Sequence, residues 1–262
     1  MKKLLTILFF TPFVLLAQES LERLEQSPRH HEWVTIEYGE RALKGFLVYP
    51  EVSEKVPLII VIHENRGLND WARSMADQIA EAGYIAFAPD LLSGSGPNNG
   101  GTSDFKNSDD ARTAIYALDP EQVTSDLSAT VSYLKKVPSG NGKVAVIGFC
   151  WGGSQSFRFA TNSKEIKAAY VCYGTGPKND EAYENIEVPV YGFYGGNDNR
   201  VNATIERSSR IMNAQNKTYE PVIYAGAGHG FFRAGEASDA SVDNKKGRAD
   251  GMKRLKKLLS EL

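Results

Sequence analysis

The segment Gly148–Gly153 has the residue types and spacing of a turn that presents a nucleophile. Cys150 stands at its centre, an apolar run ends just before it, and a segment of helical composition follows. Such a strand–turn–helix connection is sharp and strained, and it holds the central side chain clear of the backbone. Glycines flank the centre at Gly148 and Gly152, where a Cβ would collide with the neighbouring strand or helix. The helix that follows directs its N-terminus at the sulfur, which predicts a stabilised thiolate.

A thiol nucleophile needs a base and a group that orients the base, and two later segments supply candidates for both. His229 lies among glycines directly after the last apolar run, whereas the other histidines lie before residue 64. Asp198 follows the preceding apolar run, within Gly-Gly-Asn-Asp. The chain order predicts Cys150, Asp198 and His229 as a catalytic triad. The alternatives are a structural histidine and an aspartate that serves only its turn, because Gly-Gly-Asn-Asp is also good turn sequence.

The segment His63–Gly67 is the candidate for a further catalytic element, a backbone donor for an oxyanion. It follows an apolar run, and in enzymes with this type of nucleophile turn the loop at that place donates one N–H. The residue after the nucleophile donates the other. The predicted donors are Asn65 and Trp151. We expect no metal and no cofactor, because the histidines lack ligand spacing and the sequence has no HExxH or paired-cysteine motif.

Short, nearly continuous apolar runs alternate with helical patterns along the chain. Such runs are typical of strands that are buried on both faces of a parallel sheet. The predicted strands are Leu58–Ile62, Tyr84–Ala88, Val144–Phe149, Ala168–Cys172, Val188–Tyr194 and Val222–Ala225. The predicted helices carry apolar stripes at Trp71, Met75 and Ile79 after an Asn69 N-cap, at Val123, Leu127, Val131 and Leu134, and at Met252, Leu255, Leu259 and Leu262.

Two alternating segments, Glu32–Tyr38 and Leu43–Tyr49, precede these runs and predict an antiparallel hairpin. The fold class is therefore α/β: a doubly wound, mostly parallel sheet with an N-terminal antiparallel hairpin. A Gly/Ser/Asn-rich stretch over 93–103, within a loop over 92–108, follows one of the parallel strands. It lies at the edge where such sheets bind ligands, so it is either part of a substrate pocket or a solvated loop without a role.

The first residues predict a secretory signal peptide over 1–17. Two lysines precede the apolar stretch Leu4–Leu16, and a small residue follows it. The stretch is shorter than the about 20 residues that a membrane span needs, so we expect cleavage and no stable membrane anchor. The mature chain would be exported to the periplasm or secreted. It would have a flexible N-terminus with exposed histidines over 18–31, and one domain over 32–262.

The net charge of −2 limits the classes of partner, and the two cysteines limit the redox chemistry. No basic run indicates nucleic acid. In an oxidising compartment Cys150 and Cys172 could form a disulfide. One is expected on the turn and the other inside a strand, so we predict two thiols, with Cys172 as a small buried hydrophobe.

From residue 32 to its last residue the chain resembles the dienelactone hydrolase family, which has the α/β-hydrolase fold. The segments that carry the resemblance are His63–Gly67, Ala88–Leu91, Gly148–Gly153, Tyr173-Gly174, Tyr194–Asp198 and Gly228–Arg233. The resemblance implies hydrolysis of a small-molecule ester or lactone through the cysteine, histidine and aspartate above and a thioester acyl-enzyme.

The resemblance also implies roles for four further residues. Glu64 would hold the resting thiol and move towards Arg233 when substrate binds, and Tyr173 would contact the substrate. The family arginine that grips a substrate carboxylate has Arg112 as its candidate, which could equally be a solvated helix residue. The rival interpretations are a carbohydrate-ester or peptide-releasing hydrolase on the same fold, and a binding or redox-responsive relative without turnover.

Overall fold

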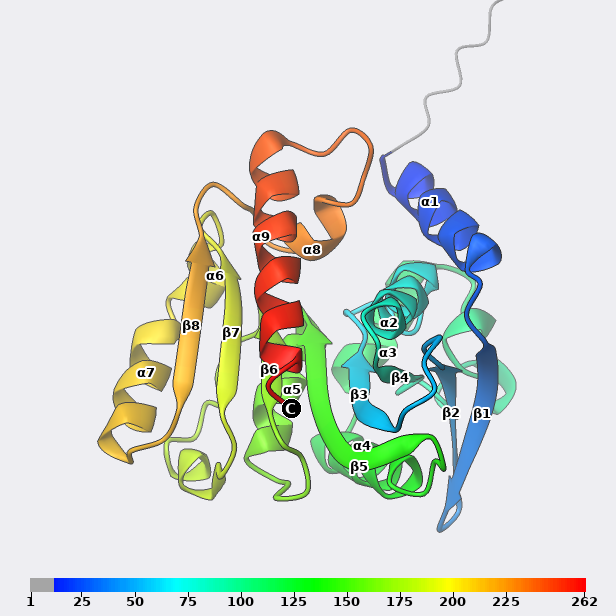
Figure 1. Ribbon diagram of the computed structural model, residues 1–262, viewed down its shortest axis with the longest axis horizontal. Coiled ribbons are helices and arrows are strands. Elements are labelled where there is room, and N and C mark those ends of the chain that lie inside the picture. Colours follow the sequence, from blue (N-terminus) through cyan, green and yellow to red (C-terminus); the bar gives the residue numbers. More distant parts are fainter. Residues whose placement is uncertain (1–11) are drawn as a thin grey trace, which may run out of the picture.

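The apolar runs form one sheet in the computed structural model, which describes residues 12–262, with side-chain surroundings from residue 19 onward. Within this part of the chain the sheet has the strand order β1-β2-β4-β3-β5-β6-β7-β8 (Figure 1). β1 pairs antiparallel with β2, β2 pairs antiparallel with β4, and all other pairs are parallel. The strands are β1 (His31–Tyr38), β2 (Arg41–Val48), β3 (Val56–Ile62), β4 (Ile85–Pro89), β5 (Gly140–Phe149), β6 (Ala169–Cys172), β7 (Val190–Gly195) and β8 (Tyr219–Tyr224). The predicted fold class and the predicted hairpin are confirmed.

Helices cover both faces of the sheet (Figure 1). α2, α8 and α9 pack into one core, and α4, α5 and α7 pack into the other. The helices are α1 (Pro12–Gln26), α2 (Asp70–Glu81), α3 (Ser108–Ala117), α4 (Pro120–Leu134), α5 (Trp151–Ala160), α6 (Asn199–Asn202), α7 (Ile205–Ala214), α8 (Phe231–Ala234) and α9 (Val242–Leu259). Short 3-10 turns occupy Pro97–Asn99, Thr102–Asp104 and Glu181–Asn185.

The strand β3 shows why these strands have no polar alternation. Leu58, Ile60 and Ile62 point into the core beneath α4 and α5. Ile59 and Val61, between them, point into the core beneath α2 and α9. Because side chains alternate between the faces and both faces are covered, every position must be apolar.

The predicted helix signals hold at α2 and α4. The Asn69 side chain caps α2 by accepting a hydrogen bond from the Ala72 amide at 3.0 Å. Its predicted stripe is buried, as is the predicted stripe of α4. In the last helix Leu255 and Leu259 of the predicted stripe are buried and Met252 is partly buried. Leu262, also partly buried, lies after the helix ends at Leu259.

The N-terminal segment differs from the prediction of a flexible stretch over 18–31. Helix α1 lies beside α2 (Figure 1) and buries Leu24. After the helix, Arg29 and His31 both bind the buried carboxylate of Asp77 on α2. His31 is therefore largely buried, with 22% of its side chain exposed, whereas its neighbour His30 is exposed as predicted. Residues 19–31 thus differ from the predicted flexible segment in having a helix, a buried ion pair and an apolar contact that fasten them to α2.

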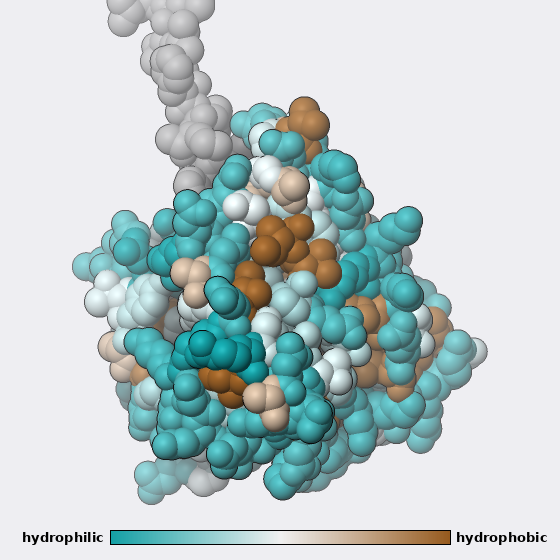
Figure 2. Space-filling view, turned by 90° about the vertical axis from the view of Figure 1, so that its left-hand side faces the viewer, coloured by the Kyte–Doolittle hydropathy of each residue, from teal (hydrophilic) through white to brown (hydrophobic). Residues whose placement is uncertain are grey.

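The predicted signal peptide, 1–17, lies mostly outside the described residues, and α1 begins within it at Pro12. Of the helices in the described part of the chain, none has the length and apolar character needed to cross a bilayer. On the side of the molecule that carries α7 and β8, apolar residues form small separate patches in a mostly hydrophilic surface (Figure 2).

Candidate functional site

The predicted nucleophile turn joins β5 to α5 with Cys150 between them. Its backbone has φ 56° and ψ −114°, the strained conformation that lifts a side chain away from both elements. The flanking glycines permit the close approach: a Cβ on Gly148 would lie 1.9 Å from the Gly152 carbonyl oxygen. A Cβ on Gly152 would lie 2.3 Å from the His63 carbonyl oxygen, so the turn also touches the loop after β3.

The structure brings the three predicted triad residues together. His229 Nε2 lies 3.1 Å from Cys150 Sγ, and His229 Nδ1 lies 2.5 Å from Asp198 Oδ2. Because a carboxylate only accepts, Nδ1 carries a proton and Nε2 is left to accept the thiol proton. Asp198 is buried, and its other oxygen accepts from the Val201 amide at 3.4 Å, which caps α6.

The loop that carries His229 is fixed by its own contacts. The Gly228 amide donates to Asn244 Oδ1 at 2.9 Å, and the Asn197 amide donates to the Ala227 carbonyl at 2.9 Å. The second bond joins the loops that carry the acid and the base, so their separation is set by the backbone.

The surroundings of Cys150 favour the thiol over the expected thiolate. Burial and the negative charge of Glu64 raise its pKa to about 11. The Trp151 amide at the start of α5 lowers the pKa, as do the positive charges of Arg200 and Arg233, but these are the smaller influences. The helix terminus therefore acts in the predicted direction and is outweighed.

The family resemblance implied that Glu64 holds the thiol in the resting state. In this structure Glu64 does not hold it. Its Oε2 accepts from Arg233 Nε at 2.7 Å, and its Oε1 accepts from the Tyr173 hydroxyl at 3.3 Å. Burial lowers the pKa of Arg233, but the Glu64 carboxylate raises it overall, which indicates a charged pair. Glu64 thus occupies the position expected after its release, and the thiol is bound to His229 instead.

The family resemblance implied that Tyr173 contacts the substrate, but the structure does not place it to do so. Its side chain is 1% exposed, with its ring 5.1 Å from that of His229 in an edge-to-face arrangement. The hydroxyl faces Glu64, so Tyr173 packs beneath the triad. The backbone conformation accompanies the difference: Tyr173 directly follows β6 and has a φ of 41°.

The two predicted oxyanion donors lie on adjoining segments. Trp151 is the first residue of α5, and its amide lowers the pKa of the neighbouring Cys150 thiol. Asn65 lies in the loop after β3, and its side-chain amide donates to the Tyr116 hydroxyl at 3.2 Å. The sequence did not indicate this contact with α3.

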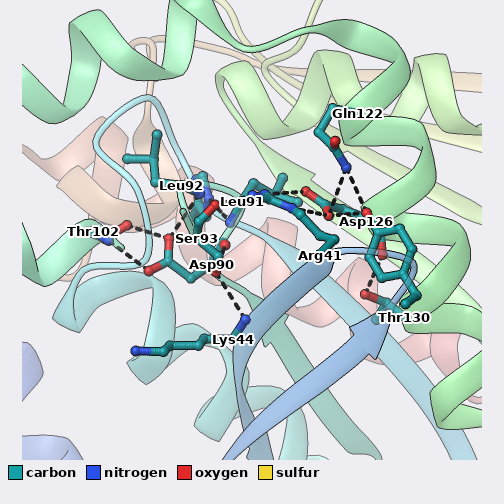
Figure 3. Close-up of polar contacts among 12 residues, drawn as sticks. Arg41, Lys44, Asp90, Leu91, Leu92, Ser93, Thr102, Gln122, Asp126 and Thr130 are labelled. Carbon is teal, nitrogen blue, oxygen red and sulfur yellow. Dashed lines mark hydrogen bonds and ion pairs between the residues drawn. The ribbon is translucent and has the colours of Figure 1, made fainter. Parts of the chain in front are cut away.

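The loop over 92–108 is fastened at its base. Asp90 accepts from the Thr102 amide and hydroxyl at 2.8 and 2.7 Å (Figure 3). Thr102 Oγ1 in turn accepts from the Leu68 amide at 2.9 Å, which ties this loop to the one after β3. A cavity of about 310 Å³ beside it is lined by Trp33, Val34, Thr35, Lys44, Leu68, Asp90, Gly101, Ser103 and Asp104.

Arg112 lies apart from the triad contacts. Its guanidinium is 54% exposed and pairs with Asp109 at 4.0 Å on the same helix face of α3. The solvated-helix alternative fits this position better than substrate binding does.

Metal chemistry and a disulfide find no support in the described residues. Between residues 19 and 262, no group of three or more His, Cys, Asp or Glu side chains could hold a metal ion. Cys150 and Cys172 are both free in this part of the chain, and Cys172 is fully buried as predicted.

Sequence reasoning missed His63, which it placed only at the start of a loop. The structure buries its ring completely and stacks it on Trp151. The position directly after an apolar strand was the available signal. It also missed Arg200, an exposed cation two residues after Asp198 whose charge reaches the thiol.

Known proteins are similar to this chain in sequence or in fold. A Methylorubrum extorquens protein named "Putative carboxymethylenebutenolidase" is 29% identical over 76% of this chain and 71% of its own length. Among solved structures, a "Putative Dienelactone Hydrolase" from Klebsiella pneumoniae has a TM-score of 0.77 at 23% identity, covering 89% of this chain and 99% of that one. A dienelactone hydrolase-like promiscuous phosphotriesterase from metagenomic libraries has a TM-score of 0.74 at 22% identity, covering 89% and 98%.

The two solved structures show the shared fold. A sequence profile of the dienelactone hydrolase family matches residues 43–262, which include every predicted site residue. The chain therefore belongs to the dienelactone hydrolase family and is an ester or lactone hydrolase with the α/β-hydrolase fold.

Proposed function

We propose that the chain hydrolyses small carboxylic esters or lactones through a Cys150–His229–Asp198 triad and a thioester acyl-enzyme. The observation that carries the proposal is the continuous chain of contacts from thiol to imidazole to carboxylate, 3.1 and 2.5 Å long. A base within hydrogen-bond reach of a nucleophile, itself oriented by a third group, is the arrangement that nucleophilic catalysis requires.

In the first half of the reaction, His229 Nε2 takes the proton of Cys150 as Sγ attacks the substrate carbonyl carbon. Asp198 stabilises the imidazolium that forms. The new C–S bond puts negative charge on the carbonyl oxygen, which accepts from the Asn65 and Trp151 amides. When the tetrahedral intermediate collapses, the C–O bond to the leaving group breaks and the imidazolium protonates the departing oxygen.

In the second half, water replaces the thiol. His229 removes a proton from a water molecule, whose oxygen attacks the thioester carbonyl. The intermediate expels the thiolate, which regains a proton from the imidazolium, and the carboxylic acid leaves. For a lactone, acid and alcohol are one product.

The pKa of Cys150 is about 11, so a mechanism in which the thiol loses its proton at the moment of attack fits better than one that starts from a permanent thiolate. A thiol that stays protonated between turnovers resists oxidation, because the thiolate is the reactive form. The raised pKa thus favours turnover over the redox-responsive alternative. We propose that the Glu64–Arg233 pair contributes to this control, since the negative charge of Glu64 faces the sulfur.

Replacing the nucleophile tests the proposal directly. We expect Cys150→Ala to lose at least about a thousandfold in kcat on p-nitrophenyl acetate and on a dienelactone. The matched control is Cys172→Ala, which removes the other thiol, in the core beneath α2, and should leave kcat near the wild-type value. Equal activity of Cys150→Ala and the wild type would overturn the triad.

We also propose that the protein is exported through cleavage of its first 17 residues. The proposal depends on the two lysines and the apolar stretch of the leader. N-terminal sequencing of the chain from its native cells, separated into fractions, tests it. A mature N-terminus near residue 18 in the periplasmic or external fraction is expected, and an intact leader in the cytosol would contradict it.

A further inference from the structure

The buried histidine at the end of β3 is joined to both predicted oxyanion donors. His63 precedes Glu64 and Asn65 in the loop, and its ring is fully buried. The hydrolytic mechanism proposed above assigns this imidazole no proton to carry. A buried polar ring without a role in proton transfer needs another explanation, which its contacts supply.

The two ring nitrogens of His63 have different partners. Nδ1 lies 2.8 Å from the Glu64 carbonyl oxygen, and Nε2 lies 3.4 Å from the Leu91 amide. A carbonyl only accepts and an amide only donates, so Nδ1 carries the proton and Nε2 is bare. Burial lowers the pKa of His63, which keeps this neutral form.

The bond to the Glu64 carbonyl fixes a peptide plane that ends in a predicted oxyanion donor. The Glu64 carbonyl and the Asn65 amide belong to the same peptide unit. The described residues contain no cis peptide bond, so this unit is trans. In a trans peptide the C=O and the N–H point in opposite directions within one plane. When His63 Nδ1–H holds the oxygen on its side, the Asn65 N–H is directed away from the imidazole.

The same ring supports the other donor. The rings of His63 and Trp151 stack, with centroids 5.6 Å apart and planes 11° apart. The backbones also touch, because a Cβ on Gly152 would lie 2.3 Å from the His63 carbonyl oxygen. Trp151 supplies the second amide, so a shift of the His63 ring would displace both donors together.

We propose that His63 is a positioning residue that aims the Asn65 amide through the Glu64–Asn65 peptide plane and seats Trp151 by stacking. The inference rests on the proposed function, because it assumes that these amides receive the oxyanion. It assigns His63 no proton transfer and no substrate contact. Its main effect is on the charge that develops on the substrate oxygen.

Three substitutions at this position separate the two contacts. His63→Phe keeps an aromatic ring for Trp151 and removes the Nδ1 donor. His63→Asn places an amide nitrogen close to the Nδ1 position and can still donate to the Glu64 carbonyl. His63→Gln can satisfy the Leu91 amide but not the Glu64 carbonyl. The control is His30→Phe, an exposed histidine on the same chain.

We expect His63→Phe and His63→Gln to lose about a hundredfold in kcat on p-nitrophenyl acetate, the effect of losing one oxyanion donor, with KM little changed. His63→Asn should recover at least about tenfold of this loss, and His30→Phe should match the wild type. If His63→Phe does not fold, the ratio of kcat in His63→Asn to kcat in His63→Gln tests the inference. Equal kcat for these two, or wild-type kcat in His63→Phe, would overturn the inference.

Alkylation of Cys150 by iodoacetamide provides the readout that a merely structural role would move. This reaction needs the thiol but creates no oxyanion, so its rate should change far less than kcat in all three variants. A parallel fall of alkylation and kcat would mean a damaged nucleophile turn and would overturn the inference. Failure of the proposed function itself is distinguishable, because then Cys150→Ala would also retain activity.

Discussion

Asp77 and Glu64 are both buried carboxylates that pair with arginine, and they differ in what else surrounds them. Asp77 has a fully buried side chain that accepts from Ser27 Oγ at 2.6 Å, from Arg29 at 2.9 and 2.7 Å and from His31 at 2.9 Å. Glu64 accepts from Arg233 at 2.7 Å and, more weakly, from Tyr173 at 3.3 Å, and its charge acts on the Cys150 sulfur.

The difference separates a structural pair from one suited to a site. The Asp77 carboxylate accepts four hydrogen bonds, which is about its full capacity. All four fasten the segment after α1 to α2. Glu64 is held by fewer bonds and faces a group that can exchange a proton. A saturated carboxylate rigidifies a fold, whereas a less saturated one beside a nucleophile can change partners.

The largest expected effect is at the saturated pair. Asp77→Asn removes the charge that Arg29 and His31 share, so we expect the free energy of unfolding to fall by about 3 kcal/mol, as when a buried ion pair loses one partner. Urea denaturation at pH 7 measures it. The control is Asp70→Asn, whose partly exposed pair with Arg73 on the same helix should contribute less than about 1 kcal/mol. Similar losses of unfolding free energy in both variants would contradict the structural role given to the Asp77 pair.

Acid should remove the same contribution in the wild type. Burial raises the pKa of Asp77, but hydrogen bonds from Arg29, Ser27 and His31 lower it overall. A carboxyl with a lowered folded pKa stabilises the fold above its unfolded pKa of about 3.9, and the contribution is lost as the pH falls through the folded value. The gap between wild type and Asp77→Asn should therefore narrow from pH 7 to pH 3. A constant gap in urea denaturation would be incompatible with this linkage.

The second carboxylate should act on reactivity. Burial and Glu64 raise the pKa of Cys150 to about 11, so Glu64→Gln should lower that pKa and speed alkylation by iodoacetamide at pH 8. The increase should reach up to about tenfold, the change in thiolate that one pKa unit produces. Asp77→Asn is the cross-control, because it removes a buried charge away from the sulfur and should leave alkylation unchanged. A slower reaction in Glu64→Gln would refute the electrostatic role.

The smallest expected effect concerns the exposed cation near the site. Arg200 is among the charges that lower the pKa of Cys150, and its exposure allows solvent to screen it. Arg200→Gln should slow alkylation by the anionic iodoacetate about two- to threefold relative to neutral iodoacetamide. Arg210→Gln, an exposed arginine on α7, is the control and should leave the ratio unchanged. An unaltered ratio in Arg200→Gln would place its charge outside the site.

The sequence predicted the parts of the site that depend on local geometry and chain order. Gly148 marks the turn because the contact that requires it, with the Gly152 carbonyl, lies only four residues away. Asp198 and His229 were predictable because loops after parallel strands meet at one edge of the sheet. The strands could be found from their apolar runs, since both faces are covered.

The remainder depends on contacts that no local pattern records. Arg29 reaches Asp77 across 48 positions of the chain, so the segment after α1 looked flexible in the sequence. The inward turn of Tyr173 depends on backbone conformation, and the choice of Glu64 between thiol and arginine depends on the charges of the folded site. His63 gave no sign of its stacking on Trp151, because that contact joins the loop after β3 to the first turn of α5.

The most direct test of the triad is the identity of the acylated atom. The protein is mixed with p-nitrophenyl acetate, quenched in acid during the first turnover, digested and examined by mass spectrometry. We predict the mass of one acetyl group on the peptide that contains Cys150, lost on treatment with hydroxylamine as expected for a thioester, and no acetyl group on Cys172. Turnover without an adduct on Cys150, or an adduct on a serine instead, would contradict thiol catalysis.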